Sequence, residues 1–183
     1  SGEADSARTR RDRPNVIHDQ NAVLGRANRF LAPRVTRIAT AFKTVTGLRD
    51  EDAQKTVWTG NPVRPEVIAI AGEPYPAIAD GGPINLLVFG GSLGATVFSQ
   101  IVPETIAALP ASLRKRLRIV QQCRKEDLET ARALYGTAGL DVELASFFDD
   151  MPSKLAKAHL VLSRSGASAI AELTAAGRPA ILV

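Results

Sequence analysis

The sequence contains few of the residues that form disulfides and metal sites. Its 183 residues include one cysteine, Cys123, and two histidines, His18 and His159. A single cysteine has no internal disulfide partner, and two histidines far apart in sequence give no zinc-binding pattern. We therefore expect a protein of a reducing compartment that carries no metal ion.

Long apolar runs are also missing. No uninterrupted apolar segment approaches the roughly 20 residues of a membrane-spanning helix, and no segment near the start has the composition of a secretory signal. Hydrophobic residues still make up 45% of the chain, which is enough for a core and excludes a fully disordered protein. The length suits one domain, or one domain with part of another.

The net positive charge is confined to the first third of the chain. Residues 1–60 hold 11 basic and 7 acidic side chains, a net charge of +4, whereas residues 61–183 hold 12 of each. A nucleic-acid-binding domain would carry a basic stripe on its folded body. We therefore expect no nucleic-acid partner.

The two ends predict a fragment of a longer protein. The sequence starts at Ser1 without a methionine and ends in an apolar, strand-like run at residues 179–183. Residues 1–13 are polar, small and charged, so we expect them to form a disordered tail.

From residue 84 onward, short apolar runs alternate with segments of helical spacing. We expect strands at residues 84–89, 117–122, 141–145, 159–163 and 179–183, and helices at residues 95–109, 125–138, 152–158 and 166–176. Strands that alternate with helices form a parallel sheet with helices on both faces. The fold class that this predicts is α/β.

The first third predicts part of a second α/β domain. We expect strands at residues 15–18 and 35–41, a helix at residues 23–31 and a polar loop at residues 46–55, after which residues 56–59 run into a turn. The turn Gly60-Asn61-Pro62 then marks a boundary. This places residues 14–59 in one domain and residues 60–183 in another.

A glycine-rich turn follows the first strand of the larger domain. Residues 88–95 read VFGGSLGA, with Gly90, Gly91 and Gly94 in the turn and the Ser92 hydroxyl as a donor. Glycines allow close approach to a phosphate, and a helix N-terminus attracts an anion. The spacing matches neither the dinucleotide fingerprint nor the Walker P-loop. We expect a phosphate-binding loop; the alternative is an ordinary tight turn.

A second small-residue helix start lies at residues 163–172, SRSGASAIAE. Glu172 falls four residues beyond Ser168, on the same helix face, where its carboxylate could accept both hydroxyls of a ribose. The alternative is an ordinary solvent-facing glutamate. Two anion-binding helix starts in one sheet favour a nucleoside diphosphate ligand.

Aromatic and acidic residues follow the strand at residues 141–145. Phe147 and Phe148 could pack on a base, and Asp149 or Asp150 could cap the next helix. On spacing alone we favour a core aromatic pair followed by a helix N-cap.

In combination, these segments resemble the bacterial glycosyltransferases that add N-acetylglucosamine to lipid I and so make lipid II for peptidoglycan. The resemblance covers residues 14–183. The matching stretches are HDQN at 18–21, LGRAN at 24–28, GNPVR at 60–64, GGSLGA at 90–95, FDDM at 148–151 and RSGA at 164–167 through Glu172.

The resemblance implies the GT-B arrangement, in which two Rossmann-like domains face a cleft. Residues 14–59 would then end the acceptor domain, and residues 60–183 would form a truncated donor domain. The family's donor is UDP-N-acetylglucosamine, with no further cofactor and no metal, and the catalytic base would lie outside this chain. The implied donor-binding residues are Asn21, Arg64, Ser92, Phe148, Ala167, Ser168, Ala169, Ile170, Ala171 and Glu172.

The sequence departs from the family pattern at two positions. Asp19 stands where the family often has glutamate, and Leu93 stands where glutamine is common. The first change keeps the charge and shortens the side chain. The second replaces a polar side chain with an apolar one.

The lipid-linked acceptor implies a peripheral enzyme at the cytoplasmic face of the bacterial inner membrane, with a role in cell-wall biogenesis, cell shape and cell division. Val23, Ala27 and Phe30 share one face of the expected helix. We expect this face to pack on its own domain; the alternative is that the nearby arginines bind anionic lipid. These arginines, called the arginine group below, are Arg26, Arg29, Arg34 and Arg37.

Two other functions remain open at this point. One is a different GT-B enzyme that uses a nucleotide sugar, either an epimerase or another glycosyltransferase. The other is a non-catalytic nucleotide-binding module.

Overall fold

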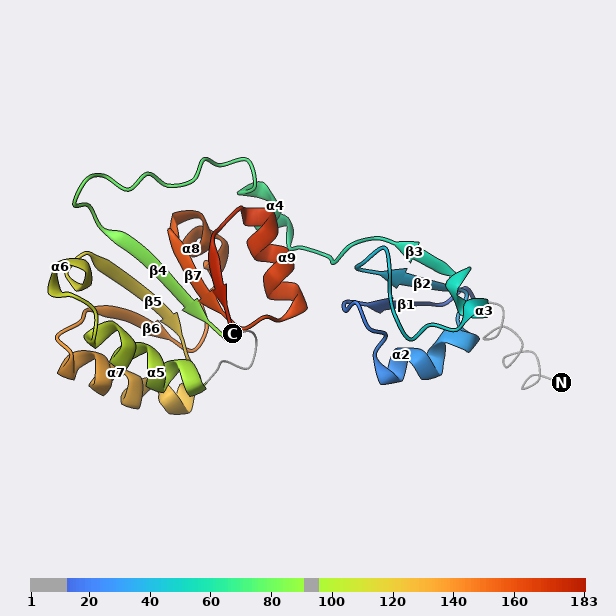
Figure 1. Cartoon of the computed structure of the whole chain (residues 1–183), viewed down its shortest axis with the longest axis horizontal. Helices are drawn as coiled ribbons and strands as arrows, with labels where there is room; N and C mark the ends of the chain where they lie inside the picture. Colours follow the sequence, from blue (N-terminus) through green and yellow to red (C-terminus); the bar gives the residue numbers. More distant parts are fainter. Residues whose placement is uncertain (1–12, 91–95) are drawn as a thin grey trace, which may run out of the picture. The chain divides into compact units, whose positions relative to one another are not determined.

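The computed structural model describes residues 13–90 and 96–183, which divide into two compact units between Pro62 and Val63 (Figure 1). Each unit has its own parallel sheet. In both described segments, no helix is long and apolar enough to cross a bilayer.

The first unit is built on three short parallel strands in the order β1-β2-β3. Its small core consists of Leu24, Ala32, Val35 and Ile38. The elements are β1 (Val16–Asp19), α2 (Arg26–Leu31), the 3-10 helix η1 (Ala32–Arg34), β2 (Arg37–Thr40), α3 (Asp50–Ala53) and β3 (Thr56–Trp58).

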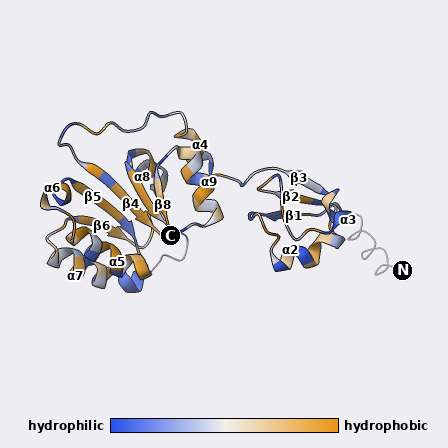
Figure 2. Ribbon diagram, in the orientation of Figure 1, coloured by the Kyte–Doolittle hydropathy of each residue, from blue (hydrophilic) through white to orange (hydrophobic). Residues whose placement is uncertain are grey.

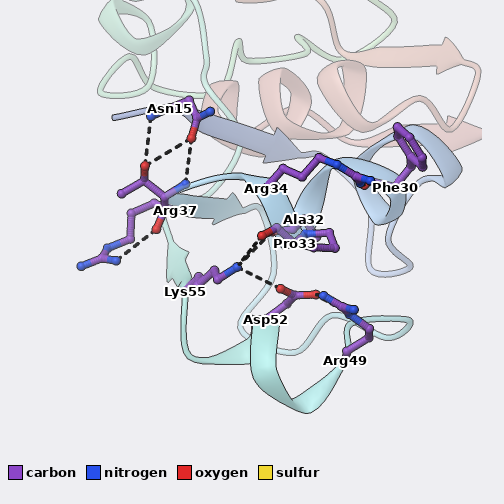
Figure 3. A network of polar contacts seen from close by, with 10 residues as sticks. Asn15, Phe30, Ala32, Pro33, Arg34, Arg37, Arg49, Asp52 and Lys55 are labelled. Atoms are coloured by element: carbon purple, nitrogen blue, oxygen red, sulfur yellow. Dashed lines mark hydrogen bonds and ion pairs between the residues drawn. The ribbon is translucent and has the colours of Figure 1, made fainter. Parts of the chain in front are cut away.

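Lys55 ties η1 to α3. Its Nζ donates to the carbonyl oxygens of Ala32 and Pro33, at 3.3 and 3.2 Å, and to Asp52 Oδ1 at 3.1 Å (Figure 3). Asp52 also accepts a hydrogen bond of 2.7 Å from Arg49 Nε. One buried carboxylate thus connects the loop before β3 to the segment before β2.

Two expectations for the first unit are wrong. The helix begins at Arg26 rather than residue 23, because Val23 forms a parallel bridge with Thr46 and the Leu24 N–H donates to the Thr46 carbonyl. Residues 46–55 are not wholly a loop, since they contain α3. Three acidic residues in the first turn of α3 suit the helix dipole.

The apolar face expected on α2 is not buried. Phe30 is 67% exposed and Val23 is also exposed, while the core takes Leu24 and Ala32 from either side of the helix. The Arg34 guanidinium lies 4.5 Å from the centre of the Phe30 ring (Figure 3). Val23 lies before the helix and Phe30 faces solvent, so the expectation that this face packs on its own domain is wrong.

The second unit has five parallel strands in the order β6-β5-β4-β7-β8. This confirms the expected parallel sheet, and the bounds of β4 and β5 match the expected strands. The strands are β4 (Ile84–Phe89), β5 (Leu117–Gln122), β6 (Val142–Ala145), β7 (Leu160–Ser163) and β8 (Ala180–Leu182).

Helices cover both faces of this sheet (Figure 1). They are α4 (Pro65–Ala69), α5 (Thr96–Ala107), α6 (Ala111–Arg114), the 3-10 helix η2 (Lys125–Asp127), α7 (Leu128–Thr137), α8 (Met151–Lys157) and α9 (Ala167–Ala176). The one-turn helices α4 and α6 were not expected, because a single turn is too short to show helical periodicity.

Alternate residues of β4 enter two cores. Leu87 and Phe89 pack with residues of α4, α8 and α9, whereas Val88 packs with residues of α5 and α7. This is the two-residue period of a strand that is covered on both faces. Figure 2 shows the resulting concentration of hydrophobic residues in the central strands.

Candidate nucleotide-binding site

A cavity of about 240 Å³ lies at the carboxyl ends of β4 and β5 in the second unit. Phe89 ends β4, Gln122 ends β5, and the loop after β6 supplies aromatic side chains. Open α/β sheets bind their ligands at this edge. The lining consists of Arg64, Phe89, Gln122, Phe147, Phe148, Met151, Ser168, Ala169 and Glu172.

Arg64 and Glu172 form a two-pronged ion pair at this cavity. Arg64 Nε donates to Glu172 Oε1 at 2.7 Å, and Nη2 donates to Oε2 at 2.9 Å. The Arg64 side chain is 48% exposed and that of Glu172 is 15% exposed. The hydrogen bonds to Glu172 raise the pKa of Arg64 above its ordinary value, against the opposing effect of burial. Glu172 is therefore not an ordinary solvent-facing helix residue.

The position of each partner follows from its helix. Arg64 occupies the N-cap of α4 with an extended backbone, and Pro65 begins the helix, where its fixed φ fits. Glu172 lies in the middle of α9, against which α4 packs. The two residues are 108 positions apart in the sequence, so spacing alone gave no sign of the pair.

The two phenylalanines behave differently. Phe148 is 7% exposed and belongs to the core beside Phe89 and Met151, whereas Phe147 is 67% exposed. Lys154 Nζ lies 4.6 Å from the centre of the Phe148 ring. The expectation of a core aromatic pair is therefore right for Phe148 and wrong for Phe147, whose ring stays at the rim of the cavity.

Asp150 stands at the N-cap of α8 without making a side-chain cap hydrogen bond. Its Oδ2 lies 3.5 Å from Lys154 Nζ instead. The Asp150 backbone, with φ of −95° and ψ of 25°, is not in the extended conformation that a capping side chain needs.

Helix α9 contributes only part of its expected set to the cavity. Ser168, Ala169 and Glu172 line it, whereas Ala167, Ile170 and Ala171 are not among the lining residues. Gly166 is the N-cap in an extended conformation. The helix ends at Gly177 with φ of 62°, in the left-handed region that glycine tolerates.

Part of the expected phosphate loop lies outside the described residues. Gly90 directly follows β4 and is buried, but Gly91, Ser92 and Gly94 fall in the undescribed segment 91–95, as does Leu93. Their roles at the diphosphate stay predictions.

Asn21 belongs to the first unit, where it is exposed beside a buried carboxylate. Asp19 accepts hydrogen bonds from the backbone N–H groups of Asn21 and Gly25, at 2.9 and 2.8 Å, and from Asn28 Nδ2 at 3.0 Å. Burial alone would raise the pKa of Asp19, but these hydrogen bonds outweigh it and hold that pKa below its ordinary value. Asp19 thus organises the loop that carries Asn21.

Sequence reasoning missed Gln122 as a lining residue. The available signal was a polar side chain at the last position of a predicted strand, where open α/β sheets bind their ligands. Within residues 13–90 and 96–183, no three His, Cys, Asp or Glu side chains gather in a way that could hold a metal ion.

Comparison with known proteins shows to which family the chain belongs. Residues 85–183 match the model of the glycosyltransferase family 28 C-terminal domain. The chain belongs to glycosyltransferase family 28. The match ends at the last residue of the chain and covers all five strands of the second sheet except the first residue of β4.

Several family 28 relatives carry the name UDP-N-acetylglucosamine–N-acetylmuramyl-(pentapeptide) pyrophosphoryl-undecaprenol N-acetylglucosamine transferase. The protein of that name from Methylobacterium sp. is 57% identical over 93% of this chain and 46% of its own length. The one from Erythrobacter litoralis is 53% identical over 97% of this chain and 44% of its own length. The chain thus spans just under half the length of these relatives.

A solved structure gives the same picture. The crystal structure of Acinetobacter baumannii MurG matches 97% of this chain and 47% of its own chain, with a TM-score of 0.68 and 30% sequence identity. Together with the family 28 match, this confirms an α/β fold with a Rossmann-like parallel sheet of the GT-B type.

Proposed function

We propose that this chain is part of an inverting glycosyltransferase that moves N-acetylglucosamine from UDP-N-acetylglucosamine to lipid I and so makes lipid II. The observation that carries the proposal is the cavity at the carboxyl ends of the strands, lined by Arg64, Phe148 and Glu172. Support comes from relatives that bear this activity in their name and are more than half identical to the chain.

In this proposal the donor nucleotide occupies the cavity of the second unit. The Glu172 carboxylate accepts the ribose hydroxyls, and the backbone at Phe148 meets the uracil edge. The α9 start, at Ala167, Ser168, Ala169, Ile170 and Ala171, faces the phosphates and the sugar, because a helix N-terminus stabilises negative charge. Ser92 and Arg64 contact the diphosphate, and Asn21 reaches the donor from the first unit.

The reaction follows from the two substrates. The 4-hydroxyl of the lipid-linked muramoyl sugar attacks C1 of N-acetylglucosamine, the bond from C1 to the diphosphate breaks, and UDP leaves with inversion at C1. Oriented N–H groups and the Arg64 guanidinium stabilise the charge on the leaving diphosphate. In this proposal residues 14–59 are the C-terminal part of the acceptor domain and residues 60–183 are a truncated donor domain.

The lipid-linked acceptor places the enzyme at the cytoplasmic face of the inner membrane as a peripheral protein. The arginine group lies in or just after α2, next to exposed Val23, Phe30 and Leu31. Each Lys or Arg near an anionic surface contributes about 1 kcal/mol to binding. Apolar side chains beside such cations add to the attraction for a lipid surface.

A donor titration and a transfer assay with the complete protein test this function. We expect uridine nucleotides to bind, and lipid II to form from lipid I only when UDP-N-acetylglucosamine is present. A preference for adenine nucleotides would instead indicate a nucleotide-binding module. Epimerisation, or transfer of a different sugar, would indicate another GT-B enzyme.

A further inference from the structure

Gln122 has no part in the proposed function, yet it sits at the donor cavity. It is the last residue of β5, it is 8% exposed, and it belongs to the cavity lining. A nearly buried amide at a strand end needs hydrogen-bond partners, because an unpaired buried polar group is costly.

The Gln122 side chain extends the pairing between β5 and β6 by one step. Backbone pairing ends with Gln122 opposite Ala145, and the Cys123 N–H then donates to the Ala145 carbonyl at 3.0 Å. Beyond that point the Gln122 Nε2 donates to the carbonyl of Ser146 at 3.1 Å. A side-chain amide thus replaces the backbone N–H that the next rung of the ladder would use.

Ser146 begins the loop that carries Phe147 and Phe148, two of the three aromatic residues that line the cavity. Phe148 is anchored in the core below the loop, whereas Phe147 is exposed and lacks such an anchor. The hydrogen bond from Gln122 therefore fixes the loop at its start, and the Phe148 ring fixes it two residues later. Phe147 and Phe148 line the same cavity as Gln122.

We propose that Gln122 is a positioning residue: its hydrogen bond to the Ser146 carbonyl holds the loop backbone at residues 146–148 in the place where that backbone recognises the base of the donor. The inference rests on the proposed function, because it takes this loop as the base-binding element. Recognition of a base edge by backbone groups depends on their placement within about 0.5 Å. Gln122 thereby controls donor affinity and base selectivity without touching the donor.

Two substitutions in the complete protein test this role. Gln122→Met keeps the length of the side chain and removes the donor. Gln122→Glu places a carboxylate against the Ser146 carbonyl. The glutamate side chain can donate a hydrogen bond to this carbonyl only when its carboxyl group is protonated, at low pH. The matched control is Gln100→Glu on the exposed face of α5, which makes the same chemical change away from the cavity.

The first measurement needs no ligand. Hydrogen exchange of the backbone amides at residues 146–149 should become about tenfold faster in Gln122→Met, as expected when one hydrogen bond that closes the loop is lost. The control should exchange like the wild type. Unchanged exchange in Gln122→Met would overturn the proposal whatever nucleotide the protein uses.

The second measurement follows donor kinetics. The KM for UDP-N-acetylglucosamine should rise about tenfold in Gln122→Met at every pH, with kcat nearly unchanged and weaker selection of UDP over CDP. In Gln122→Glu the KM should rise at pH 8 and move back toward the wild-type value as the pH falls to 5. A wild-type KM and wild-type selectivity in Gln122→Met would overturn the proposal. If the wild-type protein does not bind uridine nucleotides, the proposed function itself is overturned.

Discussion

Replacing Arg64 with alanine distinguishes two roles that this residue can have in donor binding. In the structure Arg64 donates two hydrogen bonds to Glu172, so the two groups proposed to bind diphosphate and ribose neutralise each other. The donor must therefore compete with this pair, or take its place. Either Arg64 contacts the diphosphate directly, or it acts only by holding the Glu172 carboxylate.

The stability cost of Arg64→Ala should be small. Arg64 is about half exposed, and an ion pair of that kind contributes about 0.5–1 kcal/mol after solvent screening. We expect the unfolding midpoint of the second unit to fall by only a few degrees. A change in ligand binding can therefore be measured on a folded protein.

The change in affinity should depend on the phosphates. Loss of a charged donor to the diphosphate costs about 1.5–3 kcal/mol, so UDP should bind about 10- to 100-fold more weakly to Arg64→Ala. Uridine lacks phosphates, and it gains a Glu172 carboxylate that Arg64 no longer occupies. We expect the affinity for uridine to stay the same or to rise.

Isothermal titration of the wild type and Arg64→Ala with uridine and with UDP, at low salt, measures this difference. Arg118→Ala is the matched control, because the Arg118 side chain donates to the carbonyls of Lys115 and Leu117 and is not among the residues that line the donor cavity. If Arg64→Ala loses affinity for uridine and UDP equally, direct contact of Arg64 with the diphosphate is refuted. Arg64 would then act only by orienting the Glu172 carboxylate.

Three further predictions concern Glu172, the arginine group and Asp19. Glu172→Ala should weaken uridine and UDP alike, by about 10- to 100-fold, because the ribose is common to both; titration with unchanged uridine affinity would remove Glu172 from the ribose. Changing all four residues of the arginine group to Gln should weaken salt-sensitive binding of the complete protein to anionic vesicles while the fold survives; equal co-sedimentation of the variant and the wild type at low salt would reject a membrane role for this segment. The first unit should lose stability as the pH falls below about 4, because the pKa of Asp19 is lowered in the folded state and this stabilisation is lost as Asp19 becomes protonated. Acid titration followed by circular dichroism should show a weaker dependence on pH in Asp19→Asn; an unchanged acid transition in that variant would contradict this reasoning.

The sequence predicted the elements whose pattern is local and repeated. Strands β4 and β5 have the expected bounds, because a short apolar run between turn signals has few other structures available. One-turn helices gave no such signal. Helix α2 begins three residues later than expected, because a backbone bridge between Val23 and Thr46 takes its first residues, and that partner lies in a segment that was read as a loop.

Five of the residues that line the cavity were among the donor-binding residues named from the sequence, but the contacts between them were not foreseen. Glycine turns and small helix starts indicate where a phosphate can lie, because they report on the backbone of their own segment. Whether Glu172 is free or paired depends on Arg64, which reaches it only because α4 packs against α9. Gln122 likewise acts on Ser146 across a strand pair, and its importance appears only once the register of β5 and β6 is known. The contacts at this cavity that local sequence patterns did not reveal are therefore the long-range ones, and the variants of Arg64 and Gln122 test them directly.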